Sequence, residues 1–221
     1  SFLNEDASSL KDRINDLNVI KKALLKYQHE LSSAMNEDFG NRNQMESLFG
    51  DILPLINTIN YQIKKLPFWM RPSRRKPGLL LSPAKVEIHY QPLGVIGIIV
   101  PWNFPVQLSI HPLITALSSG NKAMIKLSEF TPKTNTILQK LIDECFDKKK
   151  VMLVHGDSET AEYFTTLPFD HILFTGSTSI GKKVMKAAAE NLTPVTLELG
   201  GKSPVIICDD IRIETAVERL I

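Results

Sequence analysis

Four short apolar runs in this sequence are each followed by a polar or glycine-rich segment. The segments are Pro101–Pro105 (PWNFP), Lys126–Glu129 (KLSE), Thr175–Thr178 (TGST) and Glu198–Lys202 (ELGGK). If the apolar runs are parallel strands, these segments lie at the carboxyl ends of the strands, where open α/β sheets bind their ligands. We therefore expect one site that draws residues from all four segments.

The pair Gly176–Ser177 is expected at a turn from a strand into a helix. Backbone N–H groups and a helix N-terminus there can face an anion such as pyrophosphate, although a purely structural turn explains the pair about equally well. The segment from Gly176 to Lys183 (GSTSIGKK) comes within one residue of the phosphate-loop pattern GxxxxGK[ST]. Lys183 stands where a hydroxyl would hold magnesium, so a phosphate-loop nucleotidase is not favoured. The dinucleotide string GxGxxG is also absent.

Glu198 is the candidate general base, because it ends an apolar run and precedes two flexible glycines. Burial there is expected to favour its protonated form and to let it accept a proton from water. Taken without context, Lys126 and Glu129 would be solvated surface charges. Asn103 lies between two prolines, where an asparagine is structural about as often as it is functional.

From Gly94 onward, β-rich runs alternate with helical stretches, which predicts βαβ units and a parallel sheet. Thr131 followed by Pro132 predicts an N-cap and the first turn of a helix, and Gly120 predicts a helix end. The predicted strands are Gly94–Val100, Ala123–Lys126, Val151–His155, His171–Phe174, Val195–Leu197 and Val205–Ile207.

The first 70 residues have the spacing of amphipathic helices, with Gly40 as a stop and a bend or break near Gly50 and Pro54. Arg71–Pro83, which includes a basic run, is predicted to be a solvated loop, and the alternation over Val86–Tyr90 predicts a half-exposed strand. We expect an α/β protein: a helical segment and linker (1–83), a bridging strand (84–93), and a Rossmann-like parallel sheet with flanking helices (94–221).

The composition excludes several classes of protein. The 26 basic and 24 acidic residues nearly cancel, so neither a nucleic-acid partner nor an anionic membrane surface is expected. The longest apolar run is far shorter than the roughly 20 residues of a membrane-spanning helix. Two distant cysteines and no charged-then-apolar leader favour a reducing cytoplasm. Metal-ligand spacing is absent among the histidines, which are His29, His89, His111, His155 and His171.

The four segments, in this order and spacing, resemble the aldehyde dehydrogenase superfamily. Its usual strings PLGVVGIIxPWNFP, KPSE, FTGSTxxG and LELGGKxP correspond here to PLGVIGIIVPWNFP, KLSE, FTGSTSIG and LELGGKSP. The resemblance covers Gln91 to the C-terminus. The stretches HPLITALSSGNKAMIKLSEFTP and ENLTPVTLELGGKSP are most similar to the coniferyl aldehyde dehydrogenase group. This family binds its dinucleotide with a looser variant of the Rossmann fold, which accounts for the missing GxGxxG.

The resemblance implies roles for individual residues and makes 94–221 an NAD(P)-binding domain. The Asn103 amide is implied as a donor of the oxyanion hole, and Glu198 as the base that activates water to hydrolyse a thioester. Lys126 and Glu129 are implied at the adenosine ribose, where the carboxylate would repel a 2′-phosphate and favour NAD over NADP. Leu127 replaces the usual proline, which is expected to loosen this turn. The other implied cofactor-binding residues are Ile99, Val100, Pro101, Trp102, Ser128, Gly156, Phe174, Gly176, Ser177 and Leu199.

The implied reaction oxidises an aldehyde, with an aromatic one such as coniferyl aldehyde expected, to the carboxylic acid without a metal. The family's attacking cysteine follows the LELGG string in a GQxC segment, which this chain lacks; Cys208 ends a predicted strand, and Cys145 lies in a predicted helix. We therefore expect an N-terminal fragment that is inactive alone, from a cytoplasmic enzyme that forms a homo-oligomer. The alternative is a catalytically inert dinucleotide-binding module. An acylating relative that uses coenzyme A is disfavoured, because those enzymes generally lack the base at Glu198.

Overall fold

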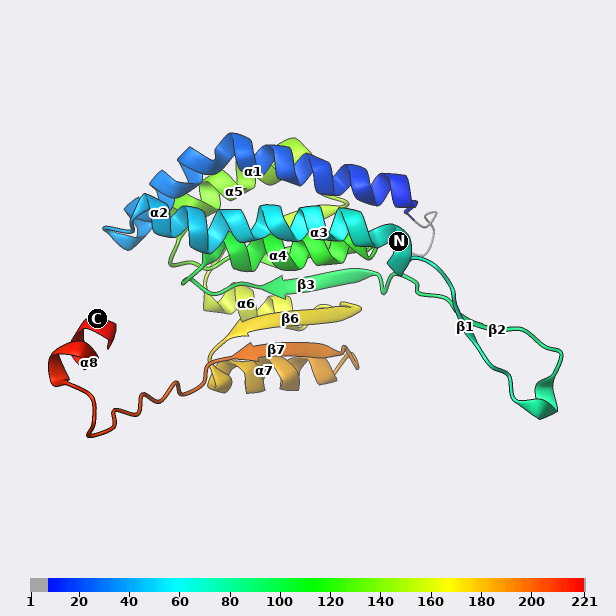
Figure 1. Ribbon diagram of the computed structural model, residues 1–221. Helices are drawn as coiled ribbons and strands as arrows, with labels where there is room; N and C mark the ends of the chain where they lie inside the picture. The colour runs from blue at the N-terminus through cyan, green and yellow to red at the C-terminus, as the bar shows by residue number, and fades with distance from the viewer. Residues whose placement is uncertain (1–7, 221) are drawn as a thin grey trace.

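The computed structural model of the chain describes residues 8–220. Its centre is a parallel sheet of five strands in the order β5-β4-β3-β6-β7 (Figure 1). The first strand of this sheet along the chain is β3, in the middle. The chain then moves outward to β5 and returns to the other side of β3. The order therefore reverses between β3 and β6, which is the switch point where open α/β sheets bind ligands. The strands are β3 (Val95–Ile99), β4 (Lys122–Lys126), β5 (Val151–Val154), β6 (His171–Gly176) and β7 (Val195–Leu199).

Helices cover both faces of the sheet, which is why its central strands are almost wholly apolar. Figure 1 shows α4 and α5 stacked with the N-terminal helices on one side of the strands. On the other face, α7 packs on β6 and β7, and α6 packs on α7. The crossover helices are α4 (Pro105–Ser118), α5 (Pro132–Cys145), α6 (Ser158–Thr165) and α7 (Thr178–Ala189).

The N-terminal segment is helical, as its periodicity predicts. Gly40 ends α1 in a left-handed conformation with φ 79°, and the predicted bend near Gly50 is a π-helical turn, η2. Leu24 of α1 and Ile59 of α3 share one hydrophobic core with Ile98 of the sheet, so these helices form the outer wall of the α/β body. The elements are α1 (Leu10–Phe39), α2 (Gln44–Ser47), η2 (Leu48–Ile52) and α3 (Leu53–Trp69).

The start of α5 is predicted correctly, but the cap is not. Thr131 occupies the N-cap position before Pro132, yet its side chain makes no capping hydrogen bond. Asp38, at the end of α1, supplies the cap: its carboxylate accepts from the backbone N–H groups of Lys133 (3.0 Å) and Thr134 (2.8 Å). A sequence pattern cannot show this contact, because the two partners lie 95 residues apart.

The predicted solvated loop at Arg71–Pro83 is partly wrong. Strand β1 (Ser73–Arg75) pairs antiparallel with β2 (Val86–Ile88), and a short 3-10 turn, η3 (Leu79–Leu81), lies between them. The hairpin projects from the body (Figure 1), and the three leucines at its tip are exposed. Alternation predicts β2, whereas the charged sequence of β1 carries no such signal.

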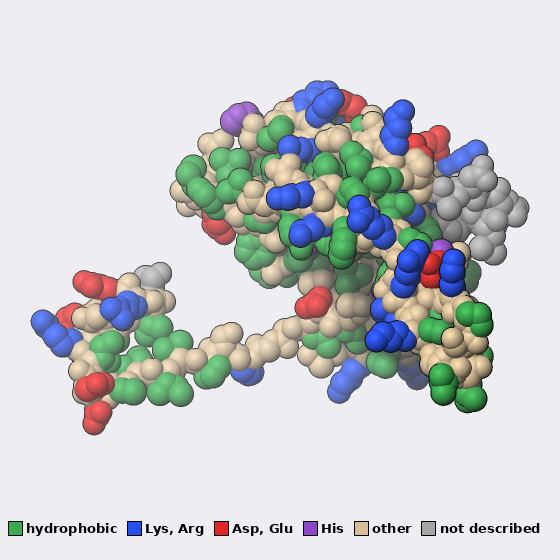
Figure 2. Space-filling view, turned by 45° about the vertical axis from the view of Figure 1, so that its right-hand side comes forward, with side chains coloured by type: hydrophobic (Ala, Val, Ile, Leu, Met, Phe, Trp, Pro, Cys, Tyr) green, Lys and Arg blue, Asp and Glu red, His purple; other side chains and the backbone are tan. Residues whose placement is uncertain are grey.

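The predicted strand at Val205–Ile207 is wrong. The segment after β7 has no regular structure until α8 (Ile213–Leu220), and Ile206 is 85% exposed. Figure 2 shows this segment and α8 extending from the body with apolar side chains on the surface. A strand exists only where a second backbone supplies hydrogen bonds, and none pairs with this run in the described chain.

No helix in the described part of the chain is long and apolar enough to cross a membrane.

Candidate functional site

All four motif segments lie at one edge of the sheet, as predicted. The strands are parallel, so the residues that follow β3, β4, β6 and β7 emerge on the same side, around the switch point. Seven of the predicted site residues are exposed there: Trp102, Asn103, Glu129, Gly156, Ser177, Glu198 and Leu199. The edge can therefore receive a ligand that crosses several strand ends.

Other predicted site residues are buried, and their side chains pack in the core. Ile99 and Phe174 belong to the apolar cluster beneath α7, and Val100 belongs to the cluster beneath α4. Ser128 is also buried; its carbonyl accepts from the Asn135 amide at 2.7 Å. These residues shape the edge through their backbone and do not present side chains to a ligand.

The loop between β3 and α4 carries an aromatic ring and an amide at the surface. The Trp102 ring is 53% exposed, and its centroid lies 6.0 Å from that of Phe39 in α1. The Asn103 side chain is exposed, and its backbone carbonyl accepts a hydrogen bond of 2.8 Å from Arg42 Nη1. Pro101 and Pro105 flank this stretch and restrict its backbone.

The turn after β4 brings together an amine and a carboxylate. Lys126 is 2% exposed, and its Nζ donates to the Leu127 carbonyl at 2.7 Å and lies 3.7 Å from Glu129 Oε2. Burial lowers the pKa of Lys126, and the charges of Glu129 and Asp157 oppose that shift. The pair presents the Glu129 carboxylate to solvent, with a cation held behind it.

Leu127 does not loosen this turn, contrary to the expectation. Its side chain is buried, and its backbone N–H donates to the Val154 carbonyl at 3.0 Å. A proline has no N–H and could not make this bond. The leucine therefore ties the turn to β5.

Helix α7 begins directly at this edge, with its first turn open to solvent. Ser177 is the N-cap, and its Oγ accepts from the Ile180 N–H at 3.4 Å. A Cβ on Gly176 would lie 2.6 Å from Phe174 Cζ, and one on Gly181 would lie 2.7 Å from Leu199 Cδ2. The glycines let α7 pack tightly on the strand ends, so they have a structural role while the helix N-terminus stays available to an anion.

Gly156 follows β5 at the same edge. Its φ of 139° is in the region that favours glycine, and a Cβ there would overlap the Thr160 side chain. Asp157 then caps α6 by accepting from the Thr160 N–H at 3.2 Å. Hydrogen bonds from this backbone lower the pKa of Asp157.

Glu198 is exposed, so the expectation that it is buried is wrong. It belongs to β7, the last strand of the sheet, and no further strand pairs with the outer side of β7 within residues 8–220. Its side chain borders a cavity of about 600 Å³ together with Thr175, His111 and His171. Glu198 lies in β7 and Asn103 follows β3, two positions away in the sheet, so their backbones are separated by two strand spacings, about 10 Å.

Cys145 is not placed to attack a ligand at this edge. Cys145 ends α5, and a crossover helix that starts at the carboxyl edge of the sheet ends at the opposite edge. Its Sγ lies 4.0 Å from the Val19 carbonyl, and burial raises its pKa to about 11. Cys208 is exposed in the segment beyond β7 and does not end a strand, contrary to the prediction.

Sequence reasoning missed two charged residues that touch the β3–α4 loop, Arg42 and Asp51. Both are buried and come from the turn after α1 and from η2. Burial raises the pKa of the Asp51 carboxyl, and hydrogen bonds from Gln107 and the charge of Arg42 oppose that shift. No local pattern marks either residue, because polar residues surround Arg42 in the sequence and other charged residues of this segment, such as Arg13, are buried as well.

No cluster of histidine, cysteine and carboxylate side chains in residues 8–220 could hold a metal ion.

A parallel sheet of this order, with polar motifs and a helix N-terminus at its switch point, defines a Rossmann-like α/β protein. The sequence model of the aldehyde dehydrogenase family matches residues 4–221. The chain belongs to the aldehyde dehydrogenase family. It spans about half the length of the curated relatives that it matches.

Two Pseudomonas proteins are among these relatives. A probable coniferyl aldehyde dehydrogenase of Pseudomonas aeruginosa is 46% identical over 220 residues, which are 100% of this chain and 46% of the relative. A coniferyl aldehyde dehydrogenase of a Pseudomonas species is 40% identical over 207 residues, covering 94% of this chain and 43% of the relative. The predicted similarity to the coniferyl aldehyde dehydrogenase group, which is based on the sequences around the motifs, is confirmed.

Solved structures give the same fold. The substrate-bound AldH of Staphylococcus aureus superposes with a TM-score of 0.90 at 38% identity, covering 96% of this chain and 46% of that one. A betaine aldehyde dehydrogenase of the same organism, solved with NAD+, has a TM-score of 0.85 at 26% identity and covers 99% of this chain and 44% of its own. The predicted α/β fold with a helical N-terminal segment is confirmed.

Proposed function

We propose that this chain forms the dinucleotide-binding part of an NAD(P)-dependent aldehyde dehydrogenase and carries two of the groups that act on the aldehyde. The observation that carries the proposal is the convergence of the four motif segments at the switch point, with the open first turn of α7 among them. The family membership supports it, because the motifs are those by which the sequence resembles the family.

The residues at the switch point fit a dinucleotide. In the proposal, the backbone N–H groups at the start of α7 and the Ser177 hydroxyl bind the pyrophosphate. The Glu129 carboxylate accepts hydrogen bonds from ribose hydroxyls, and Lys126 holds that carboxylate in place. A carboxylate at this position repels a 2′-phosphate, so we propose NAD over NADP. When bound, the nicotinamide supplies the acceptor for the hydride that leaves the aldehyde carbon.

The chain's own groups act on the aldehyde in two ways. The Asn103 amide donates a hydrogen bond to the aldehyde oxygen, which becomes negatively charged when a thiolate attacks the carbonyl carbon. Glu198 accepts a proton from the water that later cleaves the thioester, and its exposure leaves room for that water. In the proposal the attacking thiolate is neither Cys145, which lies at the opposite edge of the sheet, nor Cys208, which is not in a GQxC segment of the kind that the resembled family uses.

The substrate class that we propose is an aromatic aldehyde of the coniferyl type. It rests on the similarity to the Pseudomonas relatives that carry this name. The proposed enzyme is a cytoplasmic homo-oligomer. Relatives at 37% and 38% identity are named 4,4'-diaponeurosporen-aldehyde dehydrogenase and 4,4'-diapolycopene-4,4'-dial dehydrogenase, so the aldehydes in these names belong in any substrate panel.

Equilibrium titration of the purified chain with NAD+ and NADP+ tests the cofactor proposal. Replacing Trp69 by Phe leaves Trp102 as the sole tryptophan, and it reports on the switch point. Saturable quenching of Trp102 by NAD+, with weaker binding of NADP+, is the expected result. Absence of saturable binding of either dinucleotide would overturn the proposal.

A further inference from the structure

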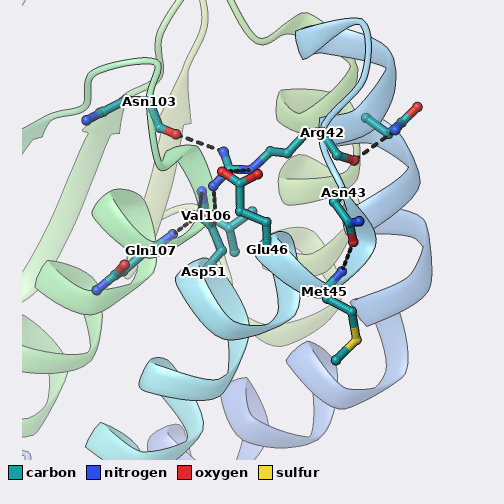
Figure 3. Close-up of polar contacts among 9 residues, drawn as sticks. Arg42, Asn43, Met45, Glu46, Asp51, Asn103, Val106 and Gln107 are labelled. Carbon is teal, nitrogen blue, oxygen red and sulfur yellow. Dashed lines mark hydrogen bonds and ion pairs between the residues drawn. The ribbon is translucent and has the colours of Figure 1, made fainter. Parts of the chain in front are cut away.

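A buried arginine from the N-terminal segment reaches into the loop that carries Asn103 (Figure 3). Arg42 is 5% exposed; its Nη1 donates to the Asn103 carbonyl at 2.8 Å, and its Nη2 lies 3.0 Å from Asp51 Oδ2. Its guanidinium lies between two rings, with its central carbon 4.9 Å from the centroids of both Phe39 and Phe104. Two hydrogen-bonded nitrogens and two stacked rings leave this side chain one orientation.

Asp51 fixes the other end of the same loop. Its carboxylate is fully buried, and Oδ1 accepts from the N–H groups of Val106 (3.1 Å) and Gln107 (2.9 Å) in the first turn of α4. Phe104, at the N-cap position of α4, has no capping side-chain bond of its own. Asp51 therefore caps α4 from 55 residues away. It lies in the π-helical turn η2, a kind of element that is frequent at functional sites.

Together, these contacts hold the loop at two points. Figure 3 shows the Asn103 carbonyl directed toward Arg42 and its side chain directed away from it. A fixed carbonyl fixes the peptide plane, and the cap at Val106 fixes where the helix begins. The backbone that carries the Asn103 side chain is thereby held in place, although the side chain itself is exposed. Gly50 permits the close approach, since a Cβ on it would lie 3.0 Å from Phe104 Cε1.

We propose that Arg42 and Asp51 are positioning residues that aim the Asn103 amide at the substrate oxygen. The inference rests on the proposed function of Asn103 and adds the N-terminal helices to the machinery of the site. Arg42 and Asp51 act through Asn103 and do not touch the substrate. Removing Arg42 releases the carbonyl and leaves the Asp51 carboxylate without its cation.

Arg13 provides a matched control, because it is another buried arginine that holds a carbonyl of the α4 region. It is 7% exposed, and its Nη1 donates to the Ser118 carbonyl at 3.2 Å, at the opposite end of that helix. Arg42→Met and Arg13→Met thus remove the same side chain from equally buried positions at the two ends of α4. Any general loss of packing affects both variants, whereas only Arg42 makes the contacts that are proposed to position Asn103.

The readout is Trp102 in the Trp69→Phe background, measured by acrylamide quenching and anisotropy in variants that circular dichroism shows to be folded. Arg42→Met is expected to raise the quenching constant about twofold, because a ring that is now 53% exposed becomes fully accessible, and to lower its anisotropy. Arg42→Lys is expected to change both values less than Arg42→Met does, since its ammonium replaces one of the two hydrogen-bonded nitrogens. Arg13→Met leaves both values unchanged.

Equal responses to Arg42→Met and Arg13→Met, or none to either, would overturn the inference. If Arg42→Met does not fold, Arg42→Lys and Gly50→Ala provide a milder comparison, because the added methyl shifts the Phe104 ring, which lies against the guanidinium, by a few tenths of an ångström. The titration with NAD+ is a separate test. If Trp102 responds to Arg42→Met and not to Arg13→Met, but the chain binds no dinucleotide, the proposed function is refuted and the contacts of Arg42 with the Asn103 loop still stand.

Activity gives a second readout. In a protein that contains this chain and oxidises aldehydes, Arg42→Met is expected to lower kcat by about 10- to 100-fold, the usual effect of misplacing a reacting group by about 1 Å. KM for NAD is expected to change less than kcat, because the proposed contacts at α7 and at the turn after β4 are untouched and only the Trp102 side of the dinucleotide site lies on this loop. A fall in kcat of the same size in Arg13→Met would contradict a positioning role.

Discussion

A charge placed at the start of α7 gives a direct test of the proposed pyrophosphate site. Ser177 is the exposed N-cap, and both aspartate and asparagine are good N-caps. Ser177→Asp and Ser177→Asn therefore both preserve the helix, and they differ from each other only in charge. In the proposal, the pyrophosphate binds at this helix end. The Asp carboxylate then lies within about 4–6 Å of a phosphate, because both groups are hydrogen-bonded to the same first turn of α7.

The expected loss of affinity follows from Coulomb's law. Two like charges about 5 Å apart repel by about 1 kcal/mol in water and by about 3 kcal/mol at the effective dielectric of a protein surface. The exposed position places the effect at about 1–2 kcal/mol, which is about a 5- to 30-fold weaker Kd. The charge also cancels part of the attraction between the helix dipole and the anion.

Calorimetric titration with NAD+ at low ionic strength measures this difference, and repetition at higher salt should reduce it. Ser177→Asn keeps a side-chain donor, its amide N–H, in place of the hydroxyl, so it is expected to bind within about twofold of the unmodified chain, a difference of less than 0.5 kcal/mol. Equal affinity of the Asp and Asn variants would refute the placement of the pyrophosphate at α7.

Three other predictions concern the cofactor and the thiols. Glu129→Gln is expected to narrow the preference for NAD+ over NADP+ by about 10-fold or more, since a charge-assisted hydrogen bond contributes about 1.5–3 kcal/mol. An unchanged ratio of the two Kd values would contradict this prediction, and Glu162→Gln is the control variant. At pH 8, iodoacetamide should modify the exposed Cys208 first and should modify Cys145, whose pKa is about 11, only when the chain unfolds. Mass spectrometry measures the two rates of modification, and equal rates in the folded chain would show that Cys145 is accessible. The chain alone should produce no NADH from coniferyl aldehyde at 340 nm, and turnover abolished by Cys208→Ala would show that the nucleophile has been misplaced.

The sheet could be predicted from the sequence because each strand carries its own signal. The runs around Ile98, Ile125 and Ile172 are apolar, short and followed by turn residues, and the strands that form there match the prediction closely. The motif segments could be placed for the same reason, since a parallel sheet puts all its carboxyl ends on one side. The division of the chain at residues 83 and 93 stays a prediction.

The errors come from contacts between residues distant in the sequence. Asp38 and Asp51 cap α5 and α4 across 95 and 55 residues, and no local pattern marks them. Glu198 ends an apolar run, which suggests burial, but it lies on the outermost strand of the described sheet. The run at Val205–Ile207 has the composition of a strand and lacks a partner in the described chain, so composition alone does not decide its structure.

Hydrogen exchange of the chain with and without NAD+ tests the central claim most directly, because it locates the ligand. The account predicts protection at the carboxyl edge of the sheet, in the loop around Trp102, the turn at Lys126–Glu129 and the first turn of α7. A larger cavity, of about 920 Å³, lies at the opposite edge of the sheet and is bordered by Arg13, Gln62 and Asn121. Protection confined to the residues around that cavity, or no protection at saturating NAD+, would contradict the account.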